Sequence, residues 1–187
     1  MASSGKRIPL PWATVMVVIL CMPLTFYLGK WNFPLWVSFI VWAQYFALGA
    51  NVGTWRVILP SLPFGASFAA AWCTSALTVS PFFVERFGPV HGLYVSYALT
   101  SVLWAALLVH GLSWSKAFTT GTLAVFQGFT LQFATYFTHS VPKIGPIENP
   151  YYLIWWSFLW SVLIGLFGWF LGWLNVLLTF PRRQASN

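Results

Sequence analysis

The chain has 187 residues, of which 59% are hydrophobic and 6% are charged, and its formal net charge at pH 7 is +7. A soluble globular domain carries roughly a quarter charged residues, so this composition excludes an ordinary soluble domain and indicates an integral membrane protein. The apolar runs are continuous over about 20 residues and lack the alternation that is typical of membrane β-strands. We therefore predict an all-α polytopic helical bundle that forms a single integral membrane domain over residues 1–187.

The nine basic residues stand singly between apolar runs or near the two ends of the chain. Such a distribution favours a role in membrane orientation over nucleic-acid binding. Cys21 and Cys73 both fall inside apolar runs, where a thiol packs as a small hydrophobic group. The three histidines show no metal-ligand spacing. We therefore expect the lipid bilayer as the surroundings of this chain, with no nucleic acid, disulfide, metal site or cofactor.

Six membrane spans are predicted, separated by short connections that hold most of the charge, proline and glycine. They cover residues 11–29, 35–53, 64–84, 90–112, 116–139 and 151–179. The first span follows two basic residues as a signal peptide would, but a small-residue cleavage site does not follow it, so we expect this span to be retained.

Six spans would bring both ends of the chain to one side of the membrane. The basic residues on that side would be Lys6, Arg7, Arg56, Lys116, Arg182 and Arg183. Those on the other side would be Lys30, Arg86 and Lys143. An excess of Lys and Arg marks the cytoplasmic side of a membrane protein. The distribution therefore predicts a multi-pass protein with both termini in the cytoplasm.

The second span is apolar but contains two side-chain amides, Gln44 and Asn51. Seven residues are about two helical turns, so both amides would lie on nearly the same face of one helix. In hydrocarbon such groups need hydrogen-bond partners, and their face should look toward protein or water. Tyr45, beside Gln44, would either narrow a solute path with its ring or serve as a packed aromatic.

The fifth span carries Gly128, Gln132, Thr135 and His139 at spacings of four, three and four residues, which is one stripe of a helix. One interpretation is that this stripe lines a solute path, where its polar groups replace the hydrogen bonds of water. The other is that the same groups join neighbouring helices. Gln127 lies on a different face, and we expect it to be a packing contact.

The two polar spans share a short pattern, since Ala43–Phe46 and Ala134–Phe137 both read A-x-Y-F. Their offset of three spans would place the two halves of the chain in opposite orientations. An inverted repeat of three plus three spans, as found in channels and transporters, is therefore a hypothesis for this bundle.

Several absences narrow the function. The chain has no Asp, and its two acids, Glu85 and Glu148, fall in predicted loops, so a carboxylate that relays protons or holds sodium inside the bilayer is not expected. A G-x-S-x-G elbow, an H-E-x-x-H pair and a glycine-rich phosphate loop are also missing. We therefore predict that the protein is not an enzyme and has no catalytic residues.

Pairs of small residues one turn apart permit close helix packing, either within the chain or in a homo-oligomer. They are Gly49 and Gly53, Gly65 and Ala69, Ala66 and Ala70, and Gly168 and Gly172.

The pattern as a whole favours a channel or facilitator for a small neutral or weakly polar solute. The candidate lining or solute-binding residues are Gln44, Tyr45, Asn51, Gln132, Thr135 and His139. One alternative is a non-transporting subunit or scaffold that binds another membrane protein. A second alternative is an uncoupled or anion-handling transporter.

The run W-x-x-F-x-x-W-A-x-Y-F-A-x-G that begins at Trp36, together with the small-residue segment 60–72, resembles a family of small bacterial inner-membrane proteins, domain of unknown function 1097. The chain has Gly49-Ala50 where that family would have two glycines. The resemblance implies a polytopic protein of the bacterial inner (plasma) membrane. It implies no activity, and no functional residue is carried over from it.

Overall fold

A computed structural model describes residues 8–179, and within this range the chain is helical, with no β-strand. The helices are α1 (Leu10–Gly29), α2 (Trp36–Ala47), α3 (Trp55–Phe87), α4 (Pro89–Gly111), α5 (Lys116–Thr120), α6 (Thr122–Phe137) and α7 (Pro150–Thr179). Two single 3-10 turns, Val52–Thr54 and Leu112–Trp114, precede α3 and follow α4. The predicted all-α class is confirmed.

Four of these helices, α1, α3, α4 and α7, are long and apolar enough to cross a membrane. The helices α2 and α6 have 12 and 16 residues, which correspond to about 18 and 24 Å of helix. Both are shorter than the hydrocarbon core of a bilayer, which is about 30 Å thick. The fold is therefore compatible with a membrane protein, and the total of six crossings stays a prediction.

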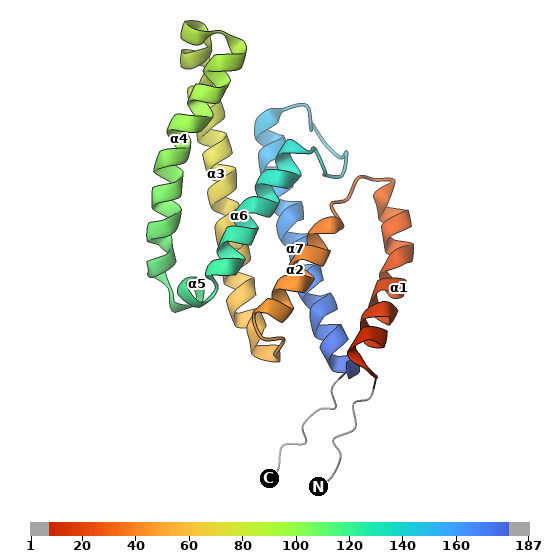
Figure 1. Cartoon of the computed structure of the whole chain (residues 1–187). Helices are drawn as coiled ribbons and strands as arrows, with labels where there is room; N and C mark the ends of the chain where they lie inside the picture. Colours follow the sequence, from red (N-terminus) through yellow and green to blue (C-terminus); the bar gives the residue numbers. More distant parts are fainter. Residues whose placement is uncertain (1–7, 180–187) are drawn as a thin grey trace.

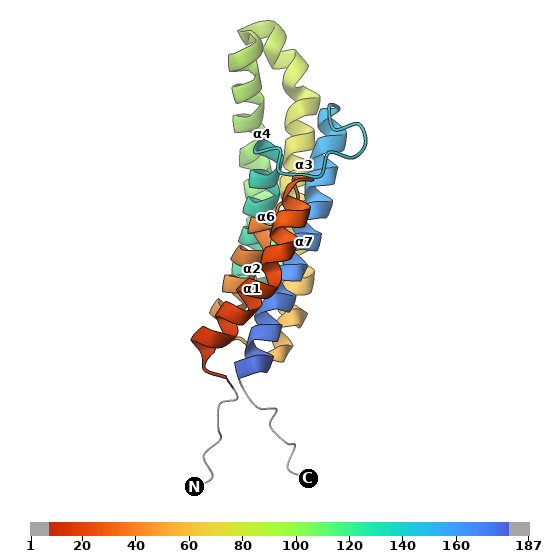
Figure 2. The same ribbon diagram turned by 90° about the vertical axis from the view of Figure 1, so that its right-hand side faces the viewer.

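Apart from the short α5, successive helices run in opposite directions, as Figure 1 shows. The beginning of α1 and the end of α7 lie at the same end of the molecule, which we call the terminal end. The helices α2, α3, α6 and α7 form the centre, while α1 and α4 lie at its two sides (Figure 1). Figure 2 shows that the molecule is much narrower in the perpendicular direction, and that the α3–α4 hairpin projects beyond the other helices at the end opposite the termini.

Glycine residues allow the central helices to approach closely. A Cβ atom at Gly65 or Gly128 would collide with the backbone of the partner helix where α3 meets α6, and one at Gly168 would collide with Ser38 where α7 meets α2. Ala66, Ala69 and Ala70 are buried as well. These small residues therefore serve contacts within the chain, as close packing of membrane helices requires, and a homo-oligomer stays a prediction.

The second predicted span ends earlier than its apolar sequence indicates. Gly49 and Ala50 have φ angles of 96° and 49°, and the Ala50 N–H donates to the Tyr45 carbonyl oxygen at 3.0 Å. Left-handed residues in this position close a helix and redirect the chain. Asn51 then follows in extended backbone outside the helix. The prediction that Gln44 and Asn51 share one face of one helix is therefore wrong.

Two further boundaries differ from the prediction. The helix α3 begins nine residues before the predicted Phe64 and includes Pro60 and Pro63. The φ angle of proline is compatible with a helix, although each ring removes one N–H donor and crowds the carbonyl four residues earlier. The fifth predicted span is divided at Gly121 into α5 and α6, and α6 ends at Phe137. His139 therefore stands beyond α6, with a φ angle of 51°.

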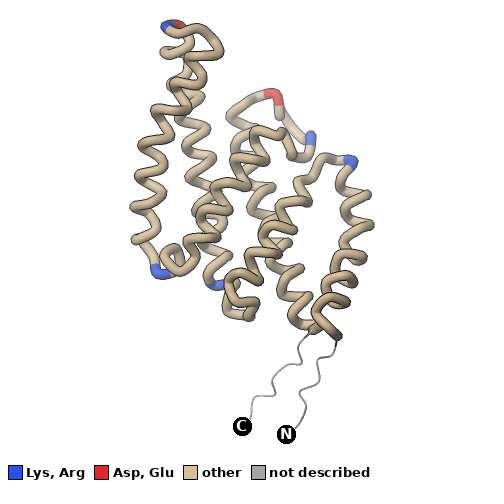
Figure 3. The backbone as a smooth tube through the Cα atoms, viewed as in Figure 1, with Lys and Arg blue, Asp and Glu red and all other residues tan. Residues whose placement is uncertain are grey.

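Charged residues gather at the two ends of the bundle, and the acidic ones lie only at the end opposite the termini in the described part of the chain (Figure 3). The terminal end holds the beginnings of α3 and α5, where Arg56 and Lys116 lie. The opposite end holds Lys30, Arg86 and Lys143 with Glu85 and Glu148. This grouping matches the predicted one. Lys6, Arg7, Arg182 and Arg183 lie outside the described residues, and the side that faces the cytoplasm stays a prediction.

Candidate functional site

The helix α2 carries two buried polar side chains whose hydrogen-bonding groups are unused. Gln44 is 1% exposed, and neither atom of its side-chain amide has a partner within residues 8–179. Tyr45 is fully buried against Gly172 of α7, and its hydroxyl likewise lacks a partner among the described residues. A buried polar group without a partner costs about 1–3 kcal/mol. These groups can therefore gain from a bond to water or to a polar solute.

The helix α6 carries the second buried pair. Gln132 is fully buried, and its Nε2 donates to the Ile154 carbonyl oxygen of α7 at 3.4 Å. Its Oε1 has no partner in the described part of the chain. Thr135 is also fully buried, but its hydroxyl donates to the Leu131 carbonyl oxygen of the same helix at 2.7 Å. Gln132 thus keeps an unused acceptor, while the hydroxyl proton of Thr135 is already engaged.

Ser157 on α7 belongs with Gln132, although the sequence analysis did not single it out. It lies one turn beyond Ile154, is fully buried, and its Oγ has no partner among residues 8–179. In the sequence, Ser157 looks the same as Ser161, whose hydroxyl bonds to a carbonyl oxygen of its own helix. The sequence therefore gives no sign that the two hydroxyls differ. Only the tertiary structure reveals the unused hydroxyl of Ser157.

The polar stripe predicted on α6 does not face one environment. Gly128 packs against α3, Gln132 contacts α7, and His139 has left the helix. Helix packing is thus the role of Gly128, while the lining of a path stays a hypothesis for Gln132. Gln127, expected to be a packing contact, is half-buried beside Ile40, and its Oε1 has no partner in the described range.

The remaining two candidates are exposed at opposite ends of the bundle. Asn51 follows α2 at the terminal end. His139 follows α6 at the other end, in an open cavity of about 570 Å³ between the α1–α2 and α6–α7 connections. The Asn32 side chain joins these connections, since its Nδ2 donates to the carbonyl oxygens of His139 and Val141 at 2.7 and 3.1 Å. Lys30, Thr138 and Lys143 also line this cavity.

The directions of α2 and α6 determine how the candidates are arranged along the bundle. The two helices run in opposite directions (Figure 1) and meet where Ile40 shares a small cavity with Thr130 and Leu131. Gln44 lies one turn from Ile40 toward the terminal end, and Gln132 lies toward the other end. At 1.5 Å per residue, the two amides are roughly 10 Å apart along the bundle. The structure therefore separates the six candidates into two groups instead of joining them in one cavity.

Apolar side chains from the four central helices fill the space between the two groups. Val41, Leu62, Leu131 and Ile164 belong to one buried cluster. A Cβ atom at Gly165 would stand 2.7 Å from Leu62 Cδ2 and 3.4 Å from Val41 Cγ2, so α2, α3 and α7 meet here without a gap. We call these four residues the apolar layer. It lies between Gln44 and Tyr45 on one side and Gln132, Thr135 and Ser157 on the other.

The chemistry available in the bundle is that of neutral hydrogen bonding. The buried groups on both sides of the apolar layer are amides and hydroxyls. Within the described residues, no three His, Cys, Asp or Glu side chains come together as metal ligands would. Amides and hydroxyls both donate and accept hydrogen bonds, so this arrangement suits an uncharged polar solute.

Comparisons of the chain with protein-family models, with curated proteins and with solved structures found no match. The resemblance to domain of unknown function 1097 therefore stays a prediction, and the proposals below depend on the geometry of the chain alone.

Proposed function

We propose that this protein is a six-span facilitator for a small neutral or weakly polar solute in the inner (plasma) membrane, with both termini in the cytoplasm. The observation that carries the proposal is Gln44, whose amide is 1% exposed and has no partner for either atom among the described residues. Polar groups inside a membrane bundle are costly and are commonly found along solute pathways. Water or a passing solute would complete the hydrogen bonds of this amide.

The apolar layer acts in this proposal as the closed gate of the path. Gln44 and Tyr45 form its polar part toward the terminal end, and Gln132 and Thr135 form its part toward the opposite end. Hydrophobic constrictions block conduction because water leaves them. A small displacement of the α2–α7 pair relative to the α3–α6 pair would open the layer and connect the two polar parts, and it would leave the close glycine contacts within each pair intact.

An inverted repeat is part of the proposal, with α1, α2 and α3 related to α4, α6 and α7. In this repeat α2 corresponds to α6 and α3 corresponds to α7. The close contact of α2 with α7 then corresponds to the close contact of α6 with α3, which supports the repeat. The ends of α2 and α6 are also closed alike, since the N–H of Ala50 donates to Tyr45 and that of Ser140 donates to Thr135, both at 3.0 Å. This pairing aligns Tyr45 with Thr135, one residue away from the A-x-Y-F match.

The test is osmotic swelling of liposomes that contain the purified protein, with a panel of uncharged solutes such as urea, glycerol and larger polyols. We expect the wild type to raise the permeability to the smaller solutes, and Gln44→Leu or Gln132→Leu to lower it. Thr130→Val is the matched control, because Thr130 lies on α6 but is exposed and bonds to its own helix. Permeability equal to that of empty liposomes across the whole panel would overturn the proposal.

The cavity beside His139 favours a second candidate, an anion-handling transporter, because Lys30 and Lys143 are among its lining residues. Chloride and phosphate flux in the same liposomes distinguishes the two candidates. For the scaffold alternative, the small-residue faces at Gly65, Ala66 and Gly168 pack within the chain, while Gly49 and Gly53 meet no other helix. Purification in mild detergent tests it, because a stoichiometric second protein would favour a scaffold.

A further inference from the structure

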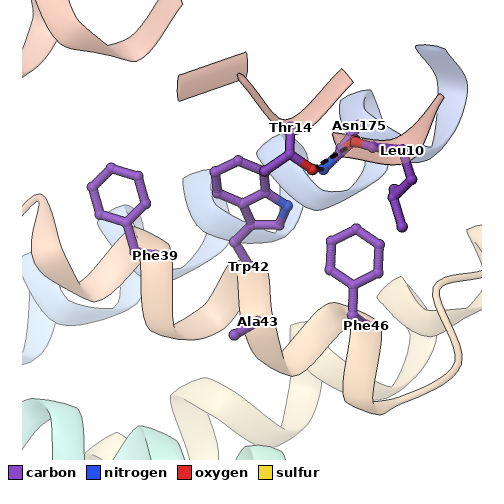
Figure 4. A pocket seen from close by; sticks show the side chains of 7 residues that line it. All are labelled: Leu10, Thr14, Phe39, Trp42, Ala43, Phe46 and Asn175. Atoms are coloured by element: carbon purple, nitrogen blue, oxygen red, sulfur yellow. Dashed lines mark hydrogen bonds between the residues drawn. The ribbon is translucent and has the colours of Figure 1, made fainter. Parts of the chain in front are cut away.

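A groove opens on the side of the bundle between α1, α2 and α7, at the terminal end (Figure 4). It has a volume of about 380 Å³ and is lined by Leu10, Thr14, Phe39, Trp42, Ala43, Phe46 and Asn175. Leu10 and Phe39 are 40% and 39% exposed, so the groove opens sideways, toward the surface that the bilayer would cover. None of the candidate residues of the proposed path lines it.

The groove exists because α1 touches the rest of the bundle along a narrow strip. Its buried residues are Ala13, Val17 and Cys21, which recur every four residues on one face. The remaining faces of α1 are largely exposed, and the helix contacts mainly α7. The space between α1 and α2 is therefore left to aromatic side chains of α2, which line the groove in Figure 4.

Two hydrogen-bonding groups in the groove are buried and unused. The Asn175 side chain is fully buried, and its Nδ2 donates to Thr14 Oγ1 at 2.9 Å, but its Oδ1 has no partner within residues 8–179. Trp42 is 6% exposed, and its Nε1–H has no acceptor in the same range. Both atoms are covered by neighbouring atoms, so a ligand that displaces this cover would meet one free acceptor and one free donor. A hydroxyl group both donates and accepts, so it is the simplest ligand group that satisfies both.

The polar and apolar parts of the groove lie at different depths. Thr14 is four residues from the start of α1, and Asn175 is hydrogen-bonded to it, so both lie about 6 Å from the beginning of α1. Phe39 lies about 10 Å further from the terminal end along α2 than Phe46 does. In a bilayer, the polar part would be near the headgroups and Phe39 would be nearer the midplane.

The change from a polar to an apolar lining with increasing depth matches a single-chain lipid, which keeps its head near the membrane surface and its tail toward the midplane. The lining residues in the described part of the chain carry no charge, so the head should be uncharged. The volume is near the lower end of the range for small-molecule sites, about 300–1,000 Å³, which fits one acyl chain better than two. We infer that this groove binds a single-chain lipid with an uncharged hydroxylated head, of the monoacylglycerol type, with its hydroxyl between Trp42 and Asn175.

The test measures binding of radiolabelled monoolein to the purified full chain in detergent, with methyl oleate and oleate as competitors. We expect saturable binding of monoolein and at least tenfold weaker competition by methyl oleate, which lacks the hydroxyl donor, and by oleate, which is charged. Equal competition by methyl oleate would overturn the inference, as would preferential binding of oleate. This comparison uses the wild-type protein and needs no variant.

Variants then locate the site. Trp42→Phe keeps an aromatic ring but removes the donor, and we expect it to weaken monoolein binding at least fivefold. Trp12→Phe is the matched control, because Trp12 on α1 is 66% exposed and is not among the lining residues. Asn175→Leu should weaken binding as Trp42→Phe does, provided that its thermal midpoint shows that the variant is folded. Equal binding by Trp42→Phe and Trp12→Phe would place the lipid elsewhere and refute the site.

Discussion

The contact between α2 and α7 makes Gly168→Ala an informative substitution. An alanine Cβ at this position would stand 2.7 Å from both Cα and the carbonyl carbon of Ser38, whereas carbon atoms pack at about 3.5–4.0 Å. Backbone atoms cannot rotate away as a side chain can, so α2 would have to retreat by about 1 Å. The retreat would loosen the contacts of Val37, Val41 and Tyr45, which are all fully buried on α2.

The expected cost follows from these contacts. Overpacking a well-packed interior typically costs 1–3 kcal/mol, and obstruction by backbone favours a value of about 3 kcal/mol. Alanine regains about 0.5–1 kcal/mol because it favours a helix over glycine. The net loss of unfolding free energy is then about 2 kcal/mol, which corresponds to a fall of about 4–8 °C in Tm for a chain of this size.

The assay is thermal unfolding of the purified protein in mild detergent, followed by circular dichroism. Gly29→Ala is the control, because a Cβ at the end of α1 would meet no heavy atom of the described chain within 4 Å. We expect this control to melt at the wild-type temperature or slightly above it. A Gly168→Ala variant that melts with the wild type would refute the close backbone contact of α2 with α7.

Three further predictions concern the gate, the connections and the topology. Leu131→Ala shortens a side chain of the apolar layer that is 3% exposed, and we expect the solute permeability of proteoliposomes to rise several-fold. The control Leu123→Ala, at a position that is 42% exposed, should leave the permeability unchanged. No rise for Leu131→Ala would contradict the role of the apolar layer as a gate. Asn32→Gly keeps the left-handed backbone but removes two hydrogen bonds, so we expect the free energy of unfolding to fall by about 2 kcal/mol. A variant as stable as the wild type in thermal unfolding would show that these bonds do not join the two connections. Lys30→Cys and Lys116→Cys should react with a membrane-impermeant maleimide from opposite sides of the membrane, and labelling from one side alone would contradict the alternating topology.

Much of the helical architecture could be predicted because a bilayer imposes a length and a polarity on each span. The helices α1 and α4 match their predicted ranges within one residue at each end, and α7 begins one residue before its predicted start, since Pro89 and Pro150 begin two of them and glycine ends α1 and α4. The burial of Gln44 and Gln132 also agrees with the prediction that amides within apolar runs turn inward. Residue type alone is not sufficient, however, because the amides of Asn51 and Gln127 also stand in apolar runs and are exposed and half-buried.

The ends of α2 and α6 could not be predicted in the same way. Gly49 and Ala50 continue an apolar run and carry no polar signal, yet they adopt left-handed backbone and exclude Asn51 from the helix. Hydropathy reports the preference of a residue for lipid, and it does not report backbone direction. The packing of α2 against α7 and the turn that follows it decide where the helix stops.

The composition by itself indicated that this chain folds into long apolar helices compatible with a membrane and that its polar residues are few. The tertiary structure decided which of them share a neighbourhood: it separated Gln44 from Gln132 and brought Thr14 to Asn175 across 161 residues of sequence. The physical reason is that a helical pattern specifies the face on which a side chain stands. The partner of that face depends on how whole helices cross, which is determined by the glycine contacts between them.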